Sequence, residues 1–106
     1  MPRHPLADVL AAEPGVIERR SQFGHPVAFW VHGREVAHFE GDDVLELRLT
    51  RPVVRAERAA LRGDPRFTLR PSASDWVELR VAPGDQADAA DALAWFRRAV
   101  AAHRPT

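Results

Sequence analysis

Two stretches of alternating apolar and polar residues constrain the fold of this chain more than any other feature. In VLELRLT, residues 44–50, each leucine is separated from the next by a charged residue, and WVELRV, residues 76–81, repeats the pattern. Successive side chains of a β-strand point to opposite faces of its sheet. Each stretch therefore predicts an antiparallel strand with one face on a core and the other in water.

Four further stretches are rich in β-forming residues and are bounded by short turns. They are VIERRS, VAFWV, EVAHFE and RFTLR, at residues 16–21, 27–31, 35–40 and 66–70. Strands that follow each other through short turns usually pair as neighbours in an antiparallel sheet. The sequence thus predicts a sheet of about six strands.

Three stretches have the spacing and the end signals of helices. HPLADVLAAEPG ends in a Pro-Gly pair, residues 51–62 follow Thr50 as candidate N-cap, and a final helix runs from about Asp85 to His103. In this last helix, the helical period predicts a core-facing edge of Ala89, Leu93, Phe96 and Val100. The predicted fold class is α+β with two layers, an antiparallel sheet and three helices on one of its faces, in the order α-ββββ-α-ββ-α.

The composition excludes several kinds of chemistry. The 106 residues contain no Cys, Lys, Tyr or Asn, so thiolate zinc sites, cysteine nucleophiles, Schiff-base lysines and P-loop lysines are impossible. His, Asp, Glu, Arg and three serines remain. The one hint of a phosphate-binding loop, HGRE, is too short to cradle a phosphate, so no cofactor is expected.

Length and charge set further bounds. A chain of this length predicts a single domain over residues 1–106. Fifteen basic residues, all of them arginine, balance fifteen acidic ones. The chain therefore has no excess of positive charge with which to bind nucleic acid. No apolar run is long enough to span a bilayer, and the N-terminus lacks the apolar stretch of a signal peptide. We therefore expect a cytoplasmic protein with neither a nucleic-acid nor a membrane partner.

The uncovered face of the predicted sheet holds the candidate functional residues. In EVAHFE, Ala37 and Phe39 are expected to face the core, and Val36, His38 and Glu40 the opposite side. Opposite charges on such a face are typical of cross-strand ladders, and Glu46 with Arg48 and Glu78 with Arg80 would fit one. Two tryptophans point instead to a binding surface. The full set expected on this face is Trp30, His32, His38, Glu40, Glu46, Arg48, Trp76, Glu78 and Arg80.

His38 and Glu40 stand out because they lie two apart on one strand. At about 6.5 to 7 Å between their Cα atoms, their side chains could converge on one metal ion. A third ligand could come from His25, Asp42 or Asp43, but no fixed spacing selects one, so no metal site is assigned. A histidine beside a tryptophan and a carboxylate is also poised for acid/base chemistry near neutral pH.

Several stretches resemble a known family. REVAHFEGDDVLELRLT and SASDWVELRV, followed by an Ala-rich final helix ending in AAHR, are similar to the small luciferase-domain family of actinobacteria and other bacteria, which is related to the fungal luciferases. The resemblance runs from FGHP at Phe23 to the end of the last helix. Its most specific parts are the Trp76 strand and, in the third strand, Arg34, Glu35, Ala37 and His38.

This resemblance implies a fold and a pocket. In the fungal enzymes, the domain belongs to a cofactor-independent oxygenase that acts on a hydroxylated styrylpyrone, and light follows from decay of the oxygenated product. Many members of the family that this chain resembles have a His-x-His pair at the position where this chain has His38 and Glu40. Exchanging an imidazole for a carboxylate retains the capacity to bind metal or accept protons but alters charge and geometry. The difference argues against a direct transfer of the oxygenase activity.

The first functional hypothesis is a luciferase-like domain that binds a small aromatic or hydroxylated molecule on the open sheet face, with oxygenase-type or acid/base chemistry. Whether the chain is an enzyme stays open. In the second hypothesis, the Trp-bearing face is a non-catalytic homodimer or partner interface. A concave pocket around His38 and Trp76 would favour the first. Its residues are His38 as base or ligand, Glu40 as the residue that orients it, Arg34 and Arg48 as anion holders, Trp30 and Trp76 as pocket walls, and Glu78 and Arg80 as further ligand contacts.

A third hypothesis rests only on the order of the elements. This order is similar to that of the bacterial double-wing family, whose members are suspected of binding DNA. The zero net charge of the chain argues against this reading, because a domain that binds phosphates shows a basic excess.

Overall fold

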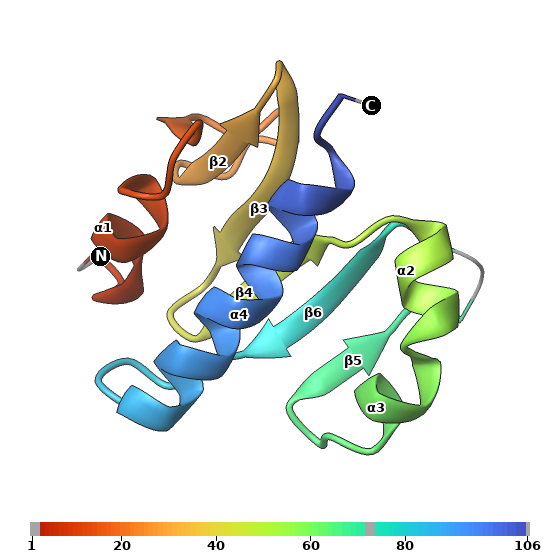
Figure 1. Cartoon of the computed structure of the whole chain (residues 1–106). Helices are drawn as coiled ribbons and strands as arrows, with labels where there is room; N and C mark the ends of the chain where they lie inside the picture. Colours follow the sequence, from red (N-terminus) through yellow and green to blue (C-terminus); the bar gives the residue numbers. More distant parts are fainter. Residues whose placement is uncertain (1–2, 72–73, 106) are drawn as a thin grey trace.

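The computed structural model describes residues 3–71 and 74–105, and its central feature is a six-stranded sheet (Figure 1). Its strand order is β1-β2-β3-β4-β6-β5, and every neighbouring pair is antiparallel. The strands are β1 (Ile17–Arg19), β2 (Ala28–Val31), β3 (Arg34–Glu40), β4 (Val44–Arg48), β5 (Phe67–Leu69) and β6 (Trp76–Arg80). The predicted antiparallel sheet is thus confirmed. β6 returns to pair with β4 after the intervening helices, which brings the two alternating stretches side by side.

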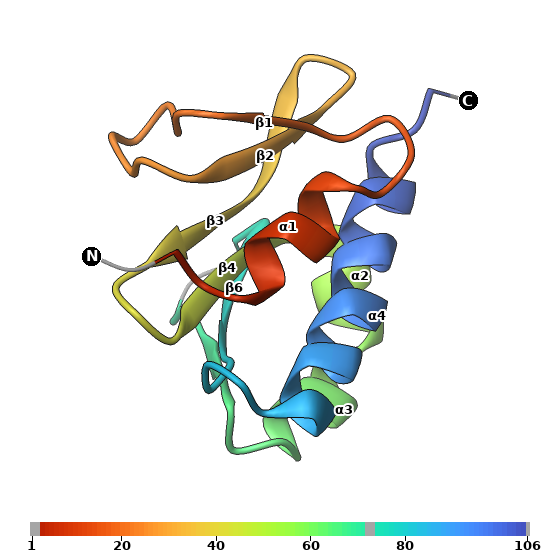
Figure 2. The ribbon, with the colours of Figure 1, turned by 90° about the vertical axis from the view of Figure 1, so that its left-hand side faces the viewer.

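The helices gather on one side of this sheet (Figure 2). They are α1 (Leu6–Ala11), α2 (Arg51–Ala56), α3 (Arg58–Arg62) and α4 (Gln86–Ala102). The α+β class with two layers is confirmed, whereas the predicted continuous helix over residues 51–62 is wrong. At Glu57, φ is −101° and ψ is 12°, so the chain leaves the helical conformation there. The described residues therefore hold four helices in place of three. None of them is long and apolar enough to cross a membrane.

The core lies between the helices and the alternating residues of the central strands. Ala37, Leu47 and Val77 stand in one row across β3, β4 and β6. Phe39, Leu45 and Leu79 form the next row, and α4 packs over β3 and β4. The buried side chains of α4 are Ala92, Phe96, Ala99 and Val100. Ala89 and Leu93, both predicted on the core-facing edge, are only partly buried, because the helix turns Ala92 and Ala99 toward the sheet.

A β-bulge interrupts the alternation of β3. Phe29 pairs with Ala37 but Trp30 pairs with Glu35, so Val36 is the extra residue on β3. A bulge of this kind changes the face to which the following side chains point. Val36 is buried in the hydrophobic core and not on the open face as predicted, whereas Glu35 contacts His38. The bulge thereby adds a carboxylate to the open face of the sheet.

Thr50 precedes α2 in an unusual backbone conformation. Its φ is 78° and its ψ is 151°, a region that is essentially restricted to glycine. Its side chain makes no capping hydrogen bond. Instead, Asp75 accepts a hydrogen bond from the Arg51 N–H at 2.9 Å. The predicted position of the N-cap is therefore right, but the group that caps the helix comes from the segment before β6.

Replacing Thr50 with glycine is expected to stabilise the protein by about 1 kcal/mol, because glycine has no Cβ to strain at this φ and ψ. Unfolding in urea, followed by circular dichroism, would measure the gain. Thr50→Ala is the matched control, since alanine keeps the Cβ and should give no gain. A lower urea midpoint for Thr50→Gly would contradict the assignment of strain.

Candidate functional site

His38 of β3 is buried on the open face of the sheet between two carboxylates. Its side chain is only 2% exposed. Nδ1 lies 2.7 Å from Glu35 Oε2, and Nε2 lies 3.0 Å from Glu46 Oε2 on the neighbouring strand β4. The first contact is a hydrogen bond. The second contact is within ion-pair distance, but its direction falls outside hydrogen-bond geometry. Nε2 therefore has no hydrogen-bond partner among the described residues.

Glu35 connects His38 to the loop between β1 and β2. Its carboxylate accepts hydrogen bonds from the Ser21 hydroxyl and from the Gln22 N–H, each at 2.8 Å. The Ser21 hydroxyl accepts in turn from the Phe23 N–H at 3.0 Å. Because a carboxylate can only accept hydrogen bonds, His38 donates its Nδ1 hydrogen to Glu35. This assigns the tautomer of the neutral ring, in which Nε2 carries the lone pair.

The surroundings of His38 raise its pKa. Burial acts first and lowers the pKa, since it disfavours the charged ring. The carboxylates of Glu46 and Glu35 act in the opposite direction and together outweigh burial, so the net pKa lies above the ordinary value for histidine. His38 is therefore a stronger base than a free imidazole.

Aromatic rings surround His38 on the side that faces the pocket. His25 stacks on it with ring centroids 4.3 Å apart, Trp76 lies at 5.1 Å and Phe23 at 5.8 Å. Phe23 and Trp76 also meet edge to face at 5.8 Å. These side chains border an open pocket of about 570 Å³, which is lined by Phe23, His25, His38, Glu40, Glu46, Arg70, Ser74, Trp76 and Glu78.

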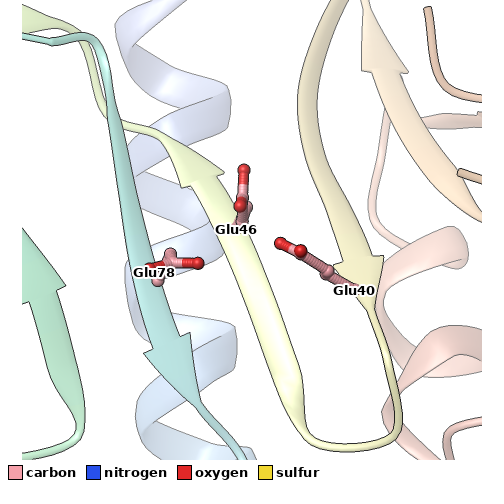
Figure 3. A group of neighbouring side chains, drawn as sticks. All are labelled: Glu40, Glu46 and Glu78. Carbon is pink, nitrogen blue, oxygen red and sulfur yellow. The ribbon is translucent and has the colours of Figure 1, made fainter. Parts of the chain in front are cut away.

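Three carboxylates lie together at this pocket. Figure 3 shows Glu40 of β3 and Glu78 of β6 reaching toward β4, from which Glu46 projects between them. One oxygen of each lies within 4.8 Å of the others. Glu46 stands directly across from Glu78 in the register of β4 and β6. The opposite-charge ladder suggested by the sequence is thus replaced by a pair of like charges, an arrangement that is destabilising unless it is compensated.

The charges around Glu46 shift the pKa values of this cluster. The His38 contact lowers the pKa of Glu46 to about 2, against the opposing effect of burial. Arg70 adds a further ion pair at 3.3 Å to the same oxygen of Glu46. Glu40 behaves in the opposite way, because the neighbouring Glu46 raises its pKa. Glu40 is therefore the carboxyl of this pair that takes up a proton first.

The structure brings some of the predicted site residues together and separates others. His38, Glu40, Trp76 and Glu78 line one pocket. Arg34 and Arg48 line a different one, near His103. Arg80 is exposed and stands across from Val44, and Trp30 is half-buried with an indole N–H that has no partner among the described residues. Arg34 and Arg48, which were predicted to bind an anion, and Trp30, which was predicted as a wall of the pocket, therefore do not line the pocket that contains His38.

The residue that orients His38 is Glu35, and not Glu40 as the sequence suggested. Glu46, placed on the open face but interpreted as part of a charge ladder, is the second partner of His38. Phe23 and Arg70 were not predicted as pocket residues, and His25 was considered only as a possible third metal ligand beside His38 and Glu40. The sequence carried one signal for Glu35, since it belongs to the stretch that resembles the luciferase-domain family.

A comparison with protein families adds an independent observation. A family model described as a luciferase domain matches residues 33–99. This range runs from the turn before β3 into the last turns of α4, and it contains His38, Glu46 and Trp76. The FGHP segment at 23–26, which was included in the resemblance noted from the sequence, lies outside it. Among curated proteins and solved structures, no match to the chain was found.

Proposed function

The chain belongs to the luciferase-domain family, and on this premise we propose that it binds a small hydroxylated aromatic molecule in the open-face pocket, where His38 exchanges a proton with the hydroxyl group. The observation that carries the proposal is the pocket of about 570 Å³ that contains both His38 and Trp76. A concave site with aromatic walls and a few convergent polar groups is typical of small-molecule binding.

The lining of the pocket favours a particular ligand chemistry. Phe23, His25 and Trp76 offer ring surfaces, against which an aromatic ligand can stack or pack edge to face. The carboxylates of Glu40, Glu46 and Glu78 accept hydrogen bonds and carry negative charge. A hydroxyl group supplies the donor that such oxygens require, whereas a ligand carboxylate would be repelled. The pocket therefore suits a neutral phenol-like molecule.

His38 provides the proton acceptor. In its neutral form, Nε2 carries the lone pair, because Nδ1 donates its hydrogen to Glu35. When Nε2 accepts a proton from the ligand hydroxyl, the imidazolium is stabilised by Glu35 and Glu46 on its two sides. Because the pKa of His38 is raised, its base form appears only at higher pH, and proton transfer should increase as pH rises through that pKa.

Deprotonation of this kind would also prepare the ligand for reaction with oxygen. A phenolate gives up an electron to O₂ more readily than the neutral phenol does. The oxygenase chemistry implied by the family resemblance would thus begin at His38, with O₂ as co-reactant and with no organic cofactor. Consumption of O₂ in the presence of a bound phenol would be its direct sign.

The expected result of a binding experiment is that 4-vinylphenol binds to the protein at least about tenfold more tightly than 4-vinylanisole, its methyl ether, because the ether cannot donate a hydrogen bond to the buried acceptors. Chemical-shift changes of the His38 ring and of the Trp76 indole N–H would report occupancy of the pocket. Trp76→Leu and His38→Gln are each expected to weaken binding of the phenol.

Trp30→Phe is the matched control, because Trp30 is a half-buried tryptophan outside the pocket and its replacement should leave binding unchanged. Equal affinity for the phenol and the ether would contradict the role of the carboxylates and His38. A phenol that binds equally well to Trp76→Leu and to the unaltered protein would remove this pocket as the site.

A further inference from the structure

Five arginines line a cleft beside the open-face pocket. The cleft has a volume of about 120 Å³ and is formed by residues of α2, α3, β5 and β6, where α3 packs against β5 (Figure 1). No acidic residue of the described part of the chain lines it, and its arginines are Arg51, Arg55, Arg58, Arg62 and Arg70. We propose that this arginine cleft binds one anionic group, a carboxylate or a phosphate, and that this group belongs to the ligand whose hydroxylated ring occupies the open-face pocket.

The positive charge on α2 and α3 is not compensated within the fold. Their sequence contains one acidic residue, Glu57, which lies at the break between the two helices and pairs with Arg98 of α4 at 2.9 Å. Like charges three or four positions apart on a helix repel each other. Such repulsion lowers stability until an anion lies among the charges. The arginines of these helices that form no ion pair with any described residue are Arg51, Arg55, Arg58 and Arg62.

The walls of the arginine cleft strengthen its attraction for an anion. Val54 and Leu69 line it and are packed against the hydrophobic core. Apolar walls focus the field of charges of one sign, so the attraction is greater than on a flat surface. A guanidinium group is planar and donates two parallel hydrogen bonds to a carboxylate or a phosphate. The small volume suits a single group of this kind and not a polymer chain.

The arginine cleft and the open-face pocket share a wall, because Arg70, Ser74 and Trp76 line both. The Arg70 guanidinium lies 3.3 Å from Glu46 Oε2, the same oxygen that lies 3.0 Å from His38 Nε2. The shared wall thus separates a pocket rich in carboxylates from a cleft rich in guanidinium groups. A ligand with a hydroxyl at one end and an anionic group at the other would be bound in one orientation.

This opposite polarity defines the class of ligand. The hydroxylated ring lies beside His38, and the carboxylates of the open-face pocket repel an anionic group, which the arginines attract. The ligand is therefore a hydroxylated aromatic acid whose acidic group lies outside the open-face pocket. The position of the ring rests on the proposed function, whereas the arginine cleft can be tested by itself.

Inorganic phosphate tests the arginine cleft alone, because it has no ring. We expect saturable shifts in the NMR signals of the arginine Nε–H groups and of the Trp76 indole N–H at millimolar phosphate. The indole signal of Trp95, which lines neither cavity, should not move. The titration is made at constant ionic strength, so that general screening of charge does not contribute.

4-Hydroxycinnamate tests the two cavities together, because it is 4-vinylphenol with a carboxylate on the vinyl group. It is expected to bind at least about tenfold more tightly than 4-vinylphenol, since the arginines donate charge-assisted hydrogen bonds to the added carboxylate. Calorimetry with both compounds gives this ratio of affinities directly.

The double variant Arg55→Gln, Arg58→Gln should remove most of this difference and weaken phosphate binding, while its affinity for 4-vinylphenol stays unchanged. Both side chains are exposed, so the fold should stay intact, and relief of repulsion should raise the urea midpoint in phosphate-free buffer. The matched control is Arg19→Gln, Arg20→Gln. It removes two exposed charges in and directly after β1, at the opposite edge of the sheet from β5, and should bind both compounds as the unaltered protein does.

The outcomes separate this inference from the proposed function. If 4-vinylphenol binds but 4-hydroxycinnamate binds no more tightly, or if the double variant keeps the tenfold difference, the inference is wrong and the proposed function stands. If 4-vinylphenol does not bind, the proposed function fails and phosphate decides the cleft. Saturable phosphate binding that the double variant loses would then support an anion site, and its absence would overturn one.

Discussion

Replacing Glu35 with alanine is expected to destabilise the folded protein by about 3 to 5 kcal/mol, because it removes one partner of a buried ion pair and leaves the other without compensation. Glu35 is fully buried and accepts hydrogen bonds from Ser21, Gln22 and His38. The alanine variant would leave three donors without this acceptor, and two of them, the Ser21 hydroxyl and His38 Nδ1, are buried. A loss of this size is a large part of the stability of a small domain.

The same substitution should lower the pKa of His38 and loosen the pocket. Glu35 is one of the two carboxylates that raise this pKa. It also ties the segment from Ser21 to Phe23 to β3, and that segment carries the aromatic wall of the pocket. We therefore expect His38 to titrate at lower pH in the variant and phenol binding to weaken, although Glu35 does not line the pocket.

Urea unfolding and NMR titration of the His38 ring would measure these two effects. Glu35→Gln keeps the shape of the side chain without its charge, and it reports the pKa change if the alanine variant does not fold. Glu40→Ala is the matched control on the same strand. Glu40 is exposed and its pKa is raised by its acidic neighbour Glu46, so its removal should cost little stability. Equal losses from Glu35→Ala and Glu40→Ala would contradict the special role of Glu35.

The alternating stretches predicted the sheet because their period reports directly on the burial of one face. Residues 44–50 and 76–81 follow this period without interruption, and their four leucines line the core together with Val77 and Val81. The break in the helix at Glu57 was not visible in the sequence, since residues 51–62 contain no glycine and no internal proline beyond the first turn. The break depends on tertiary contacts, because Leu61 packs into the core and Glu57 pairs with Arg98 of α4.

The candidate site was predictable only in part, for a comparable reason. His38, Glu40, Trp76 and Glu78 lie on the open face through regular alternation. Glu35 joins them only because a bulge shifts the register between Phe29 and Trp30. A bulge is set by strand pairing, which residues 34–40 do not encode by themselves. His25 and Phe23 reach His38 through a loop whose shape depends on the buried contact of Ser21 with Glu35.

A separate prediction concerns the response of stability to pH. The pKa of Glu46 is lowered from 4.5 to about 2 in the folded protein, so this group contributes stability that is present above pH 4.5 and is lost as pH falls through about 2. A shift of this size corresponds to about 3 kcal/mol. His38 acts with the opposite sign. Its raised pKa contributes stability that is complete below pH 6.5 and is lost as pH rises through the folded pKa.

The contribution of the His38 and Glu46 pair should therefore be greatest between about pH 4.5 and 6.5, where both groups are charged in the folded and unfolded states. In metal-free protein, with a chelator present, the stability advantage of the unaltered chain over Glu46→Gln should be largest in this window. It should decrease at pH 3 and decrease further at pH 2. Urea unfolding of both proteins at matched pH values gives the difference directly.

Glu57→Gln separates this effect from general acid sensitivity. Glu57 pairs with Arg98 at the surface and its pKa is also lowered, but water screens an exposed pair. Its stability difference from the unaltered protein should be small and should change little with pH. If the advantage over Glu46→Gln were constant from pH 6 to pH 2, the carboxylate of Glu46 would not be the group that His38 holds ionised, and the buried pair would have to be assigned to Glu35 and His38 alone.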